Sequence, residues 1–167
     1  MKIIISPYSQ KLPKEAFKND VNPSMVNPKN YPYWEQVIEL LKQQIPDLQV
    51  IQIGVTGETV LRGVDGIKHN LGQKELFELI KDCDGWFSVD NFFQHFATYY
   101  KIRNGFVMFG QSDPNIFGYK VNTNILKDRK YLRPDQYGFW WDRPYTEEAF
   151  LSAEEVVKIV LPKLTAS

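Results

Sequence analysis

The sequence contains few of the residues on which several classes of protein depend. It has one cysteine, Cys83, so an internal disulfide framework and a CxxC metal or redox motif are both excluded. We interpret Cys83 as a small buried apolar residue. The two histidines, His69 and His95, are too few for a metal site built from imidazoles. The sequence therefore predicts no metal centre and no disulfides, as expected for a reducing compartment.

Net charge and long apolar runs are also absent. Lys and Arg number 20, as do Asp and Glu, so bulk electrostatics do not imply binding to nucleic acid or to an anionic membrane. No apolar stretch approaches the roughly 20 residues that cross a bilayer. The first apolar run, residues 3–5, stops at Ser6 and Pro7, short of a secretory signal. We expect a cytoplasmic protein without a membrane span.

What the sequence does contain is an alternation of buried strands and amphipathic helices. Apolar residues at helical spacing end before Pro46 in the first helix, and a Ser-x-x-Glu capping box begins the last one. A long loop is predicted over residues 6–33. The expected strands are 1–5, 49–54, 67–71, 85–90, 105–110 and 124–126, and the expected helices are 33–44, 58–62, 73–82, 91–101 and 152–161.

This order of elements predicts an α/β fold. We expect residues 1–167 to form a single Rossmann-like domain, with a mostly parallel sheet and helices on both faces. Ligands of such sheets bind beyond the carboxyl ends of the strands, near the point where the strand order reverses. Candidate functional residues are therefore sought where strands end.

The stretch at 88–97 is the most informative of these strand ends. A strand leads directly into Asp90, and a helix begins at Asn91 and Phe92 with His95 one turn further on. Free N–H groups at a helix start can hold a diphosphate, and Asp90 could accept hydrogen bonds from sugar hydroxyls. The alternatives are that Asp90 only caps the helix and that His95 packs among aromatic residues.

A second polar turn follows the next strand. The strand ends at Gly110 and continues through Gln111 and Ser112 into Asp113-Pro114, a common turn opening. This turn could approach a ligand closely, although by itself it is weak evidence of function.

Together, the two turns resemble motifs of the heptosyltransferase-like glycosyltransferases, known as glycosyltransferase family nine. The family pattern Asp-Ser/Thr-Gly-x-x-His-Leu-Ala is similar to Asp-Asn-Phe-Phe-Gln-His-Phe-Ala at 90–97. The family turn Phe-Gly-x-Thr-Asp-Pro is similar to Phe-Gly-Gln-Ser-Asp-Pro at 109–114. Ser6, Lys29 and Glu58 more loosely resemble the family's phosphate-facing hydroxyl, phosphate-facing lysine and ribose-facing acid.

The resemblance implies the carboxyl-terminal, donor-binding half of a two-domain GT-B glycosyltransferase. Its ligand would be a nucleotide-diphosphate sugar, with Lys29 and the helix start at Asn91 and Phe92 on the diphosphate and Asp90 on the transferred sugar. Asp90 and His95 would be the catalytic candidates. Ser6, Glu58 and Asp113 would complete the donor site. No metal or other cofactor is implied.

Two departures from the family pattern affect this hypothesis. Phe92 stands where the family has glycine, which removes the freedom that lets a backbone approach phosphate closely. The acceptor-binding half is not among these 167 residues, so a partner protein or a homo-oligomer would have to supply it. A non-catalytic nucleotide-sensing or protein-interaction module is the alternative, with the aromatic segment 137–145 as a contact surface, a ligand lid or a satellite core.

Overall fold

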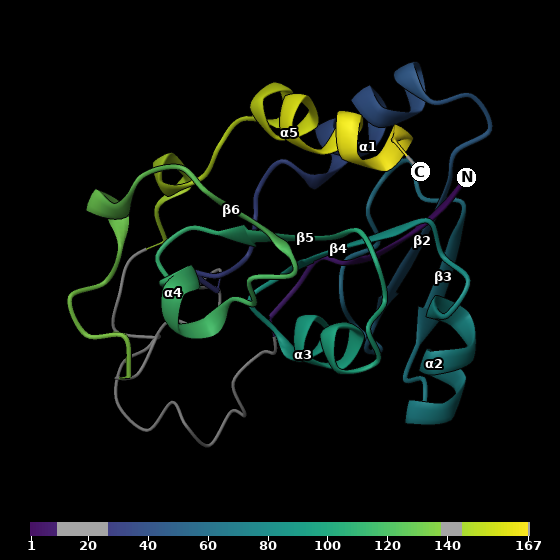
Figure 1. The fold of residues 1–167 in the computed structure, drawn as a ribbon, viewed down its shortest axis with the longest axis horizontal. Coiled ribbons are helices and arrows are strands. Elements are labelled where there is room, and N and C mark those ends of the chain that lie inside the picture. Colours follow the sequence, from purple (N-terminus) through teal and green to yellow (C-terminus); the bar gives the residue numbers. More distant parts are fainter. Residues whose placement is uncertain (10–26, 138–144, 167) are drawn as a thin grey trace.

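The computed structural model describes residues 1–9, 27–137 and 145–166. Six parallel strands form one sheet in the order β3-β2-β1-β4-β5-β6, which confirms the predicted Rossmann-like α/β fold (Figure 1). The strands are β1 (Lys2–Ser6), β2 (Gln49–Gly54), β3 (Gly66–His69), β4 (Gly85–Val89), β5 (Gly105–Phe109) and β6 (Thr123–Leu126).

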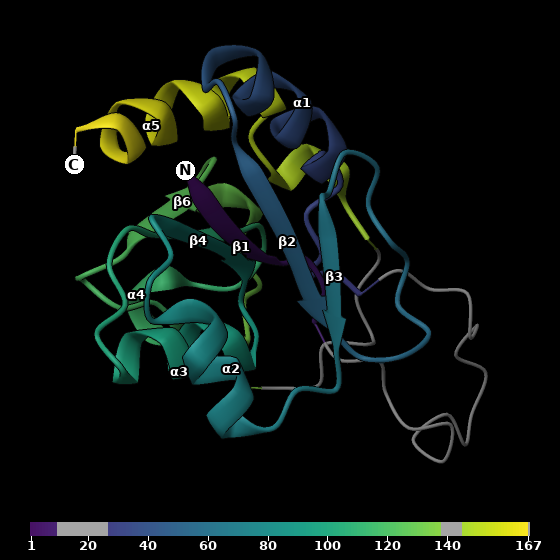
Figure 2. The ribbon, with the colours of Figure 1, turned by 90° about the vertical axis from the view of Figure 1, so that its right-hand side faces the viewer.

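Helices cover both faces of the sheet. In Figures 1 and 2, α1 and α5 lie together on one face and α2, α3 and α4 lie on the other. The helices are α1 (Trp34–Gln44), α2 (Gln73–Ile80), α3 (Phe92–Tyr99), α4 (Pro114–Phe117) and α5 (Ala153–Thr165), and the 3₁₀ helices are η2 (Arg129–Tyr131) and η4 (Glu147–Ala149).

The central strands are apolar on both sides because each side feeds a separate core. Successive residues of a strand point to opposite faces, and β1 shows the result. Ile3 and Ile5 join the cluster under α1 and α5, whereas Ile4 joins the cluster under α2 and α3. In β4, Phe87 and Trp86 divide in the same way. The near-continuous apolar runs in the sequence thus reflect strands buried on both faces.

The strand order reverses between β1 and β4. From β1 the chain builds outward through β2 to β3, and it then returns to place β4 on the other side of β1. In register, Ser6 at the end of β1 lies opposite Ser88 of β4. The loops that leave β1 and β4 therefore diverge to opposite faces, which opens a crevice beyond their carboxyl ends.

Two predicted elements are wrong. Residues 58–62 are irregular and form no helix: Glu58 ends a tight turn, in which its carboxylate accepts a hydrogen bond from the N–H of Val55 (3.1 Å). The stretch after Asp113, predicted as a loop, contains the one-turn helix α4. Asp113 caps it by accepting from the N–H of Asn115, and Pro114 supplies a first residue that needs no N–H partner.

The other elements are confirmed with shifted ends, and α5 is the largest case. It continues through Pro162 to Thr165, although its apolar spacing predicted an end at 161. Leu164 explains the extension, since its side chain is 1% exposed and packs in the core against Gly85. The predicted capping box is present, with Ser152 and Glu155 bonded reciprocally.

Parts of two predicted segments lie outside the described residues, namely 10–26 of the long loop and 138–144 of the aromatic segment. At the edges of the latter, Tyr137 is exposed, and the hydroxyl of Tyr145 donates to the carbonyl of Asn30 (3.2 Å). Cys83 is partly buried, and burial raises the pKa of its thiol to about 11, so it is a poor nucleophile near neutral pH.

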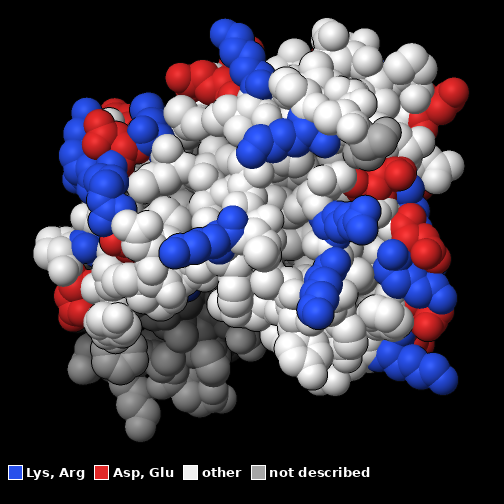
Figure 3. Space-filling model, viewed as in Figure 1, with Lys and Arg blue, Asp and Glu red and all other residues white. Residues whose placement is uncertain are grey.

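Two further features concern the charged side chains on the surface and the apolar length of the helices. On the face shown in Figure 3, Lys and Arg side chains lie singly or beside acidic ones, with uncharged surface between them. Within the described residues, no helix is long and apolar enough to cross a membrane.

Candidate functional site

A pocket of about 540 Å³ lies beyond the carboxyl ends of β1, β2, β3 and β4. It occupies the crevice where the strand order reverses, as expected for a ligand site of an open α/β sheet. Residues from five separate segments of the chain line it. They include all the candidate site residues except Asp113, namely Ser6, Lys29, Glu58, Asp90, Asn91, Phe92 and His95.

Asp90 lies at the centre of a buried charge arrangement in this pocket. It is 4% exposed, one carboxylate oxygen pairs with Lys29 Nζ at 2.7 Å, and the other accepts from Gln94 Nε2 at 2.8 Å. Gln94, which the sequence reading missed, is one helical turn along α3 and fully buried. Asp90 is thus held as an oriented carboxylate, and Lys29 places a cation beside it.

Asn91, and not Asp90, caps helix α3. Its side-chain oxygen accepts from the N–H of Phe93 (2.9 Å), while its amide nitrogen lies within hydrogen-bonding distance of Ser6 Oγ (3.0 Å) and of the carbonyls of Ser6 and Tyr8. These bonds join the end of β1 to the start of α3. The alternative that Asp90 serves as the helix cap is therefore wrong, and its carboxylate stays turned to Lys29 and Gln94.

Phe92 lines the pocket at the first residue of α3. Its side chain is 63% exposed and contacts the ring of Phe96 at 5.7 Å between centroids, whereas Phe93 points into the core. An α-helix leaves its first N–H groups without partners inside the helix, and Asn91 caps only one of them. The start of α3 therefore has backbone N–H groups without partners inside the helix, next to the pocket that Asn91 and Phe92 line.

Glu58 borders the pocket from the turn after β2. Its carboxylate lies directly against Gly54, where a Cβ atom would overlap Glu58 Oε2. A side chain at this position would require the Glu58 carboxylate to shift. Glu58 also acts on Tyr8 across the pocket: burial raises the pKa of the Tyr8 hydroxyl, and the negative charge of Glu58 raises it further.

His95 lies on the exposed side of α3 and lines the pocket. Its Nδ1 is 2.9 Å from the hydroxyl of Tyr119, and the two rings meet edge to face with centroids 5.6 Å apart. His95 thus has a hydrogen-bond partner and packs against an aromatic ring, as the alternative interpretation expected, and it also lines the pocket.

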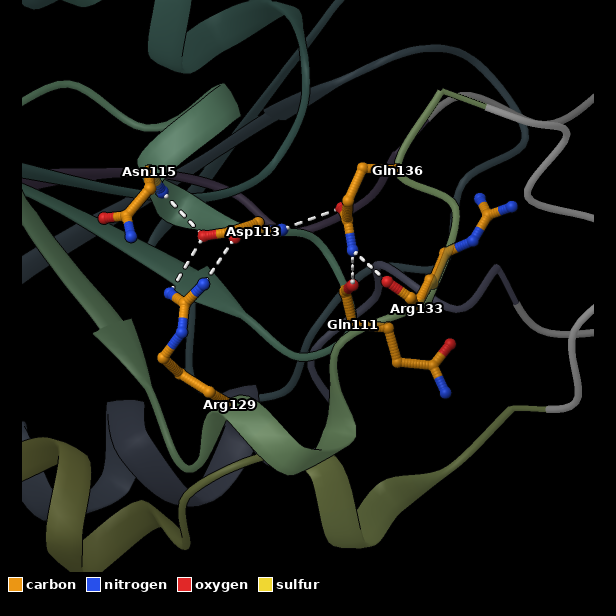
Figure 4. Close-up of polar contacts among 6 residues, drawn as sticks. All are labelled: Gln111, Asp113, Asn115, Arg129, Arg133 and Gln136. Carbon is orange, nitrogen blue, oxygen red and sulfur yellow. Dashed lines mark hydrogen bonds and ion pairs between the residues drawn. The ribbon is translucent and has the colours of Figure 1, made fainter.

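Asp113 is not among the residues that line the pocket, and its polar contacts are with neighbours of its own turn (Figure 4). Both of its oxygens accept from the Arg129 guanidinium, at 3.1 and 2.7 Å, and one also caps α4 at Asn115. Hydrogen bonding from Arg129 holds the pKa of Asp113 below its usual range. Gln136 bonds to the Asp113 N–H and to the carbonyl of Gln111. The structure places Asp113 in this turn, whereas the other predicted site residues line the pocket.

Polar residues of the pocket that were not predicted include Lys68, which lies in β3, and Asn70, which directly follows β3; the sequence shows no motif at either position. Lys68 brings a second, exposed lysine to the rim. Asn70 has a positive φ of 56° and joins the end of β3 to the end of β2. Its side-chain amide donates to Thr56 Oγ1 (2.6 Å), and its backbone N–H donates to the carbonyl of Gly54 (2.9 Å). Asn is one of the few residues that tolerate this backbone conformation, which is the only hint the sequence contained.

The pocket is divided chemically into two parts. Lys29, His95 and the start of α3 lie at the β1/β4 end, where they suit a phosphate-bearing group. Ile53 of β2, Leu71 after β3 and Leu76 of α2 provide apolar surface in the same pocket. Among the described residues, no three His, Cys, Asp or Glu side chains are grouped so as to hold a metal ion.

Comparison with solved structures tests the fold. The chain matches E. coli ADP-heptose LPS heptosyltransferase II with a TM-score of 0.61 and 14% identity over 98% of its length. It matches the iron-containing dodecameric glycosyltransferase TibC of enterotoxigenic E. coli H10407 with a TM-score of 0.65 and 17% identity over 99% of its length. The fold of this chain is therefore similar to that of part of each of these two proteins.

The likeness that the motifs predicted is therefore confirmed at the level of fold. The chain spans about 46% of the length of each of these two proteins. A structure of TibC in complex with ADP-D-β-D-heptose also matches, with a TM-score of 0.62, 16% identity and 98% coverage of this chain. No family model matches the sequence, and no curated protein matches it.

Proposed function

We propose that the pocket binds a nucleotide-diphosphate sugar, as the donor-binding part of a heptosyltransferase-like glycosyltransferase. The observation that carries the proposal is the Lys29–Asp90 pair beside the start of α3, inside the crevice where the strand order reverses. A diphosphate needs a cation and free N–H groups, and a sugar needs an oriented carboxylate. The heptosyltransferase-like fold supports the same assignment.

Each end of the pocket has a role in this proposal. Lys29 leaves Asp90 when the ligand enters and pairs with the diphosphate, which frees Asp90 to accept hydrogen bonds from the sugar. Glu58 accepts from the ribose hydroxyls, and the apolar surface at Ile53, Leu71 and Leu76 receives the base. Ser6 and Asn91 hold β1 and α3 at the correct separation.

The proposed reaction is displacement at the anomeric carbon of the sugar. The acceptor hydroxyl forms the new glycosidic bond as the bond to the diphosphate breaks, and the acceptor's proton leaves to a base. Lys29 and the N–H groups of α3 stabilise the charge that develops on the departing diphosphate. The acceptor and the base come from a partner domain, from a partner protein or from a second copy of the chain.

Calorimetry with ADP, UDP, GDP and ADP- and UDP-sugars tests binding. Lys29→Met should weaken diphosphate affinity at least about tenfold, since charge-assisted hydrogen bonds are worth about 1.5–3 kcal/mol. Lys42→Met is the matched control, because Lys42 pairs with Asp65 at the same 2.7 Å but lies outside this pocket. Lys29→Arg separates loss of charge from loss of fit. Absence of binding at millimolar ligand would reject the proposal.

Incubation of the chain with a labelled nucleotide sugar distinguishes an enzyme from a binding module. Transfer to an added acceptor, or slow hydrolysis that Asp90→Asn abolishes, indicates catalysis. Binding without either reaction favours the alternative function, a nucleotide-sensing or interaction module on the same fold.

A further inference from the structure

The His95–Tyr119 contact has no counterpart in the motifs that the sequence shares with glycosyltransferases. The Tyr119 hydroxyl lies 2.9 Å from Nδ1 of His95, and the edge-to-face packing of the rings, at an angle of 75°, sets the tilt of the imidazole. This contact occupies one ring nitrogen. Nε2 is left as the nitrogen available to a ligand, and the residue lines the pocket.

Tyr119 is placed by bonds that do not involve its hydroxyl. It directly follows Gly118, the residue that ends α4, and its carbonyl accepts from the N–H of Asn122 (3.0 Å) and from Asn124 Nδ2 (3.1 Å). Asn122 Nδ2 in turn donates to Thr98 Oγ1 on α3, at 2.9 Å. The segment is therefore fixed to α3 by its backbone and by Asn122, so removal of the hydroxyl should leave the fold in place.

At 2.9 Å the phenol can donate to Nδ1 or accept from it, and the two arrangements place the imidazole proton on different nitrogens. A neutral imidazole has one N–H and one acceptor nitrogen, and a phenol that donates to Nδ1 keeps the proton on Nε2. When the ring is charged, both nitrogens carry protons and the phenol oxygen accepts from Nδ1. We infer that Tyr119 is a positioning residue that keeps His95 as an Nε2–H donor toward the pocket in both protonation states.

This inference rests on the proposed function and refines the role of His95. An Nε2–H donor suits an anionic oxygen of the diphosphate or of the sugar's leaving group, and it cannot remove a proton from an acceptor hydroxyl. His95 is therefore a hydrogen-bond donor to the ligand and not the general base of the reaction.

The first test needs no ligand. Imidazole ¹⁵N resonances are recorded at a pH where the rings are neutral, and only His69 and His95 contribute, so His95→Gln assigns the spectrum. We expect His95 to be protonated at Nε2, with an Nδ1 shift typical of a hydrogen-bonded acceptor. Tyr119→Phe should change the His95 signals and leave those of His69 unmoved. An unchanged His95 spectrum, or a proton on Nδ1 in the wild type, would overturn the inference.

The second test uses ADP binding in a double-mutant cycle. Tyr119→Phe and His95→Ala should each weaken binding about three- to tenfold, and the double variant should be no weaker than His95→Ala. His95→Gln should recover part of the affinity, because an amide can donate as an N–H group but cannot act as a base. Additive effects, or no recovery by glutamine, would contradict the inference. If ADP fails to bind the wild type, the proposed function fails, while the ¹⁵N spectra still decide whether Tyr119 orients His95.

Discussion

Asp90 and Asp113 are closely similar in their surroundings and differ in what they can do. Each follows the end of a buried strand, β4 or β5, and each is largely buried, at 4% and 8% exposure. Each pairs with a basic side chain at 2.7 Å. Yet Asp90 lines the pocket, whereas Asp113 lies outside it and caps α4.

The difference follows from the position of the two strands in the sheet. β4 borders the point where the strand order reverses, so the loop after it faces an open crevice. β5 lies between β4 and β6, and a four-residue turn joins it to α4. The side chain of Gln136 accepts a hydrogen bond from the N–H of Asp113 in this turn. The same residue type at the end of neighbouring strands can therefore bind a ligand in one case and stabilise a turn in the other.

The largest expected effect is a difference in ligand affinity between variants of Asp90 and variants of Asp113. Asp90→Asn should weaken the binding of a nucleotide sugar about tenfold or more, because the carboxylate that accepts from sugar hydroxyls becomes a neutral amide. Asp113→Asn should change the affinity less than twofold. Calorimetry on both variants measures this. Equal losses would mean that the two sites are not functionally distinct.

Loss of the Asp113 side chain should lower the stability of the chain through the α4 turn. Asp113→Ala removes the cap and the Arg129 pairing together, and we expect the free energy of unfolding to fall by about 1–2 kcal/mol. Asp113→Asn keeps an acceptor for the Asn115 N–H and should lose less. Chemical denaturation of both variants provides the measurement, and Asp128→Asn, at the exposed cap of η2, is the control. Identical losses in the two Asp113 variants would exclude a role for the cap.

Acidification should remove the contribution of Asp113 to the free energy of unfolding. Its pKa in the folded chain is lowered by Arg129, so its stabilising effect is present above the unfolded pKa of about 3.9 and is lost as the pH falls through the folded value. The difference in unfolding free energy between the wild type and Asp113→Asn should be constant near neutral pH and shrink below about pH 4. A difference that grows on acidification would contradict the sign of this shift.

The smallest effect concerns Phe92, which borders Asp90 and stands where the resembled family has glycine. Phe92→Gly frees the backbone at the start of α3, so we expect diphosphate affinity to rise about two- to threefold while the helix loses about 0.5–1 kcal/mol. Phe92→Ala removes the same ring but keeps the Cβ atom. An equal gain in both variants would show that the ring, and not the backbone, limits access.

Local sequence was sufficient to predict the frame of the molecule. The run at 3–5 predicts a buried strand because isoleucine favours extended backbone, and the order of strands and helices then implies a parallel sheet. The placement of Asp90 and Asn91 at a strand end was equally predictable. Residues 58–62 were not, because a five-residue stretch has too little periodicity to separate a helix from a turn that Glu58 closes through its own side chain.

The sequence by itself determined which residues stand at the ends of strands, since that depends on neighbours along the chain. The tertiary structure decided their partners: Lys29 with Asp90, Arg129 with Asp113, and Tyr119 with His95. These pairs join residues far apart in the sequence, and they form only after the sheet has brought separate loops together. Side-chain chemistry can be inferred from the chain, but the environment in which that chemistry acts is created by packing.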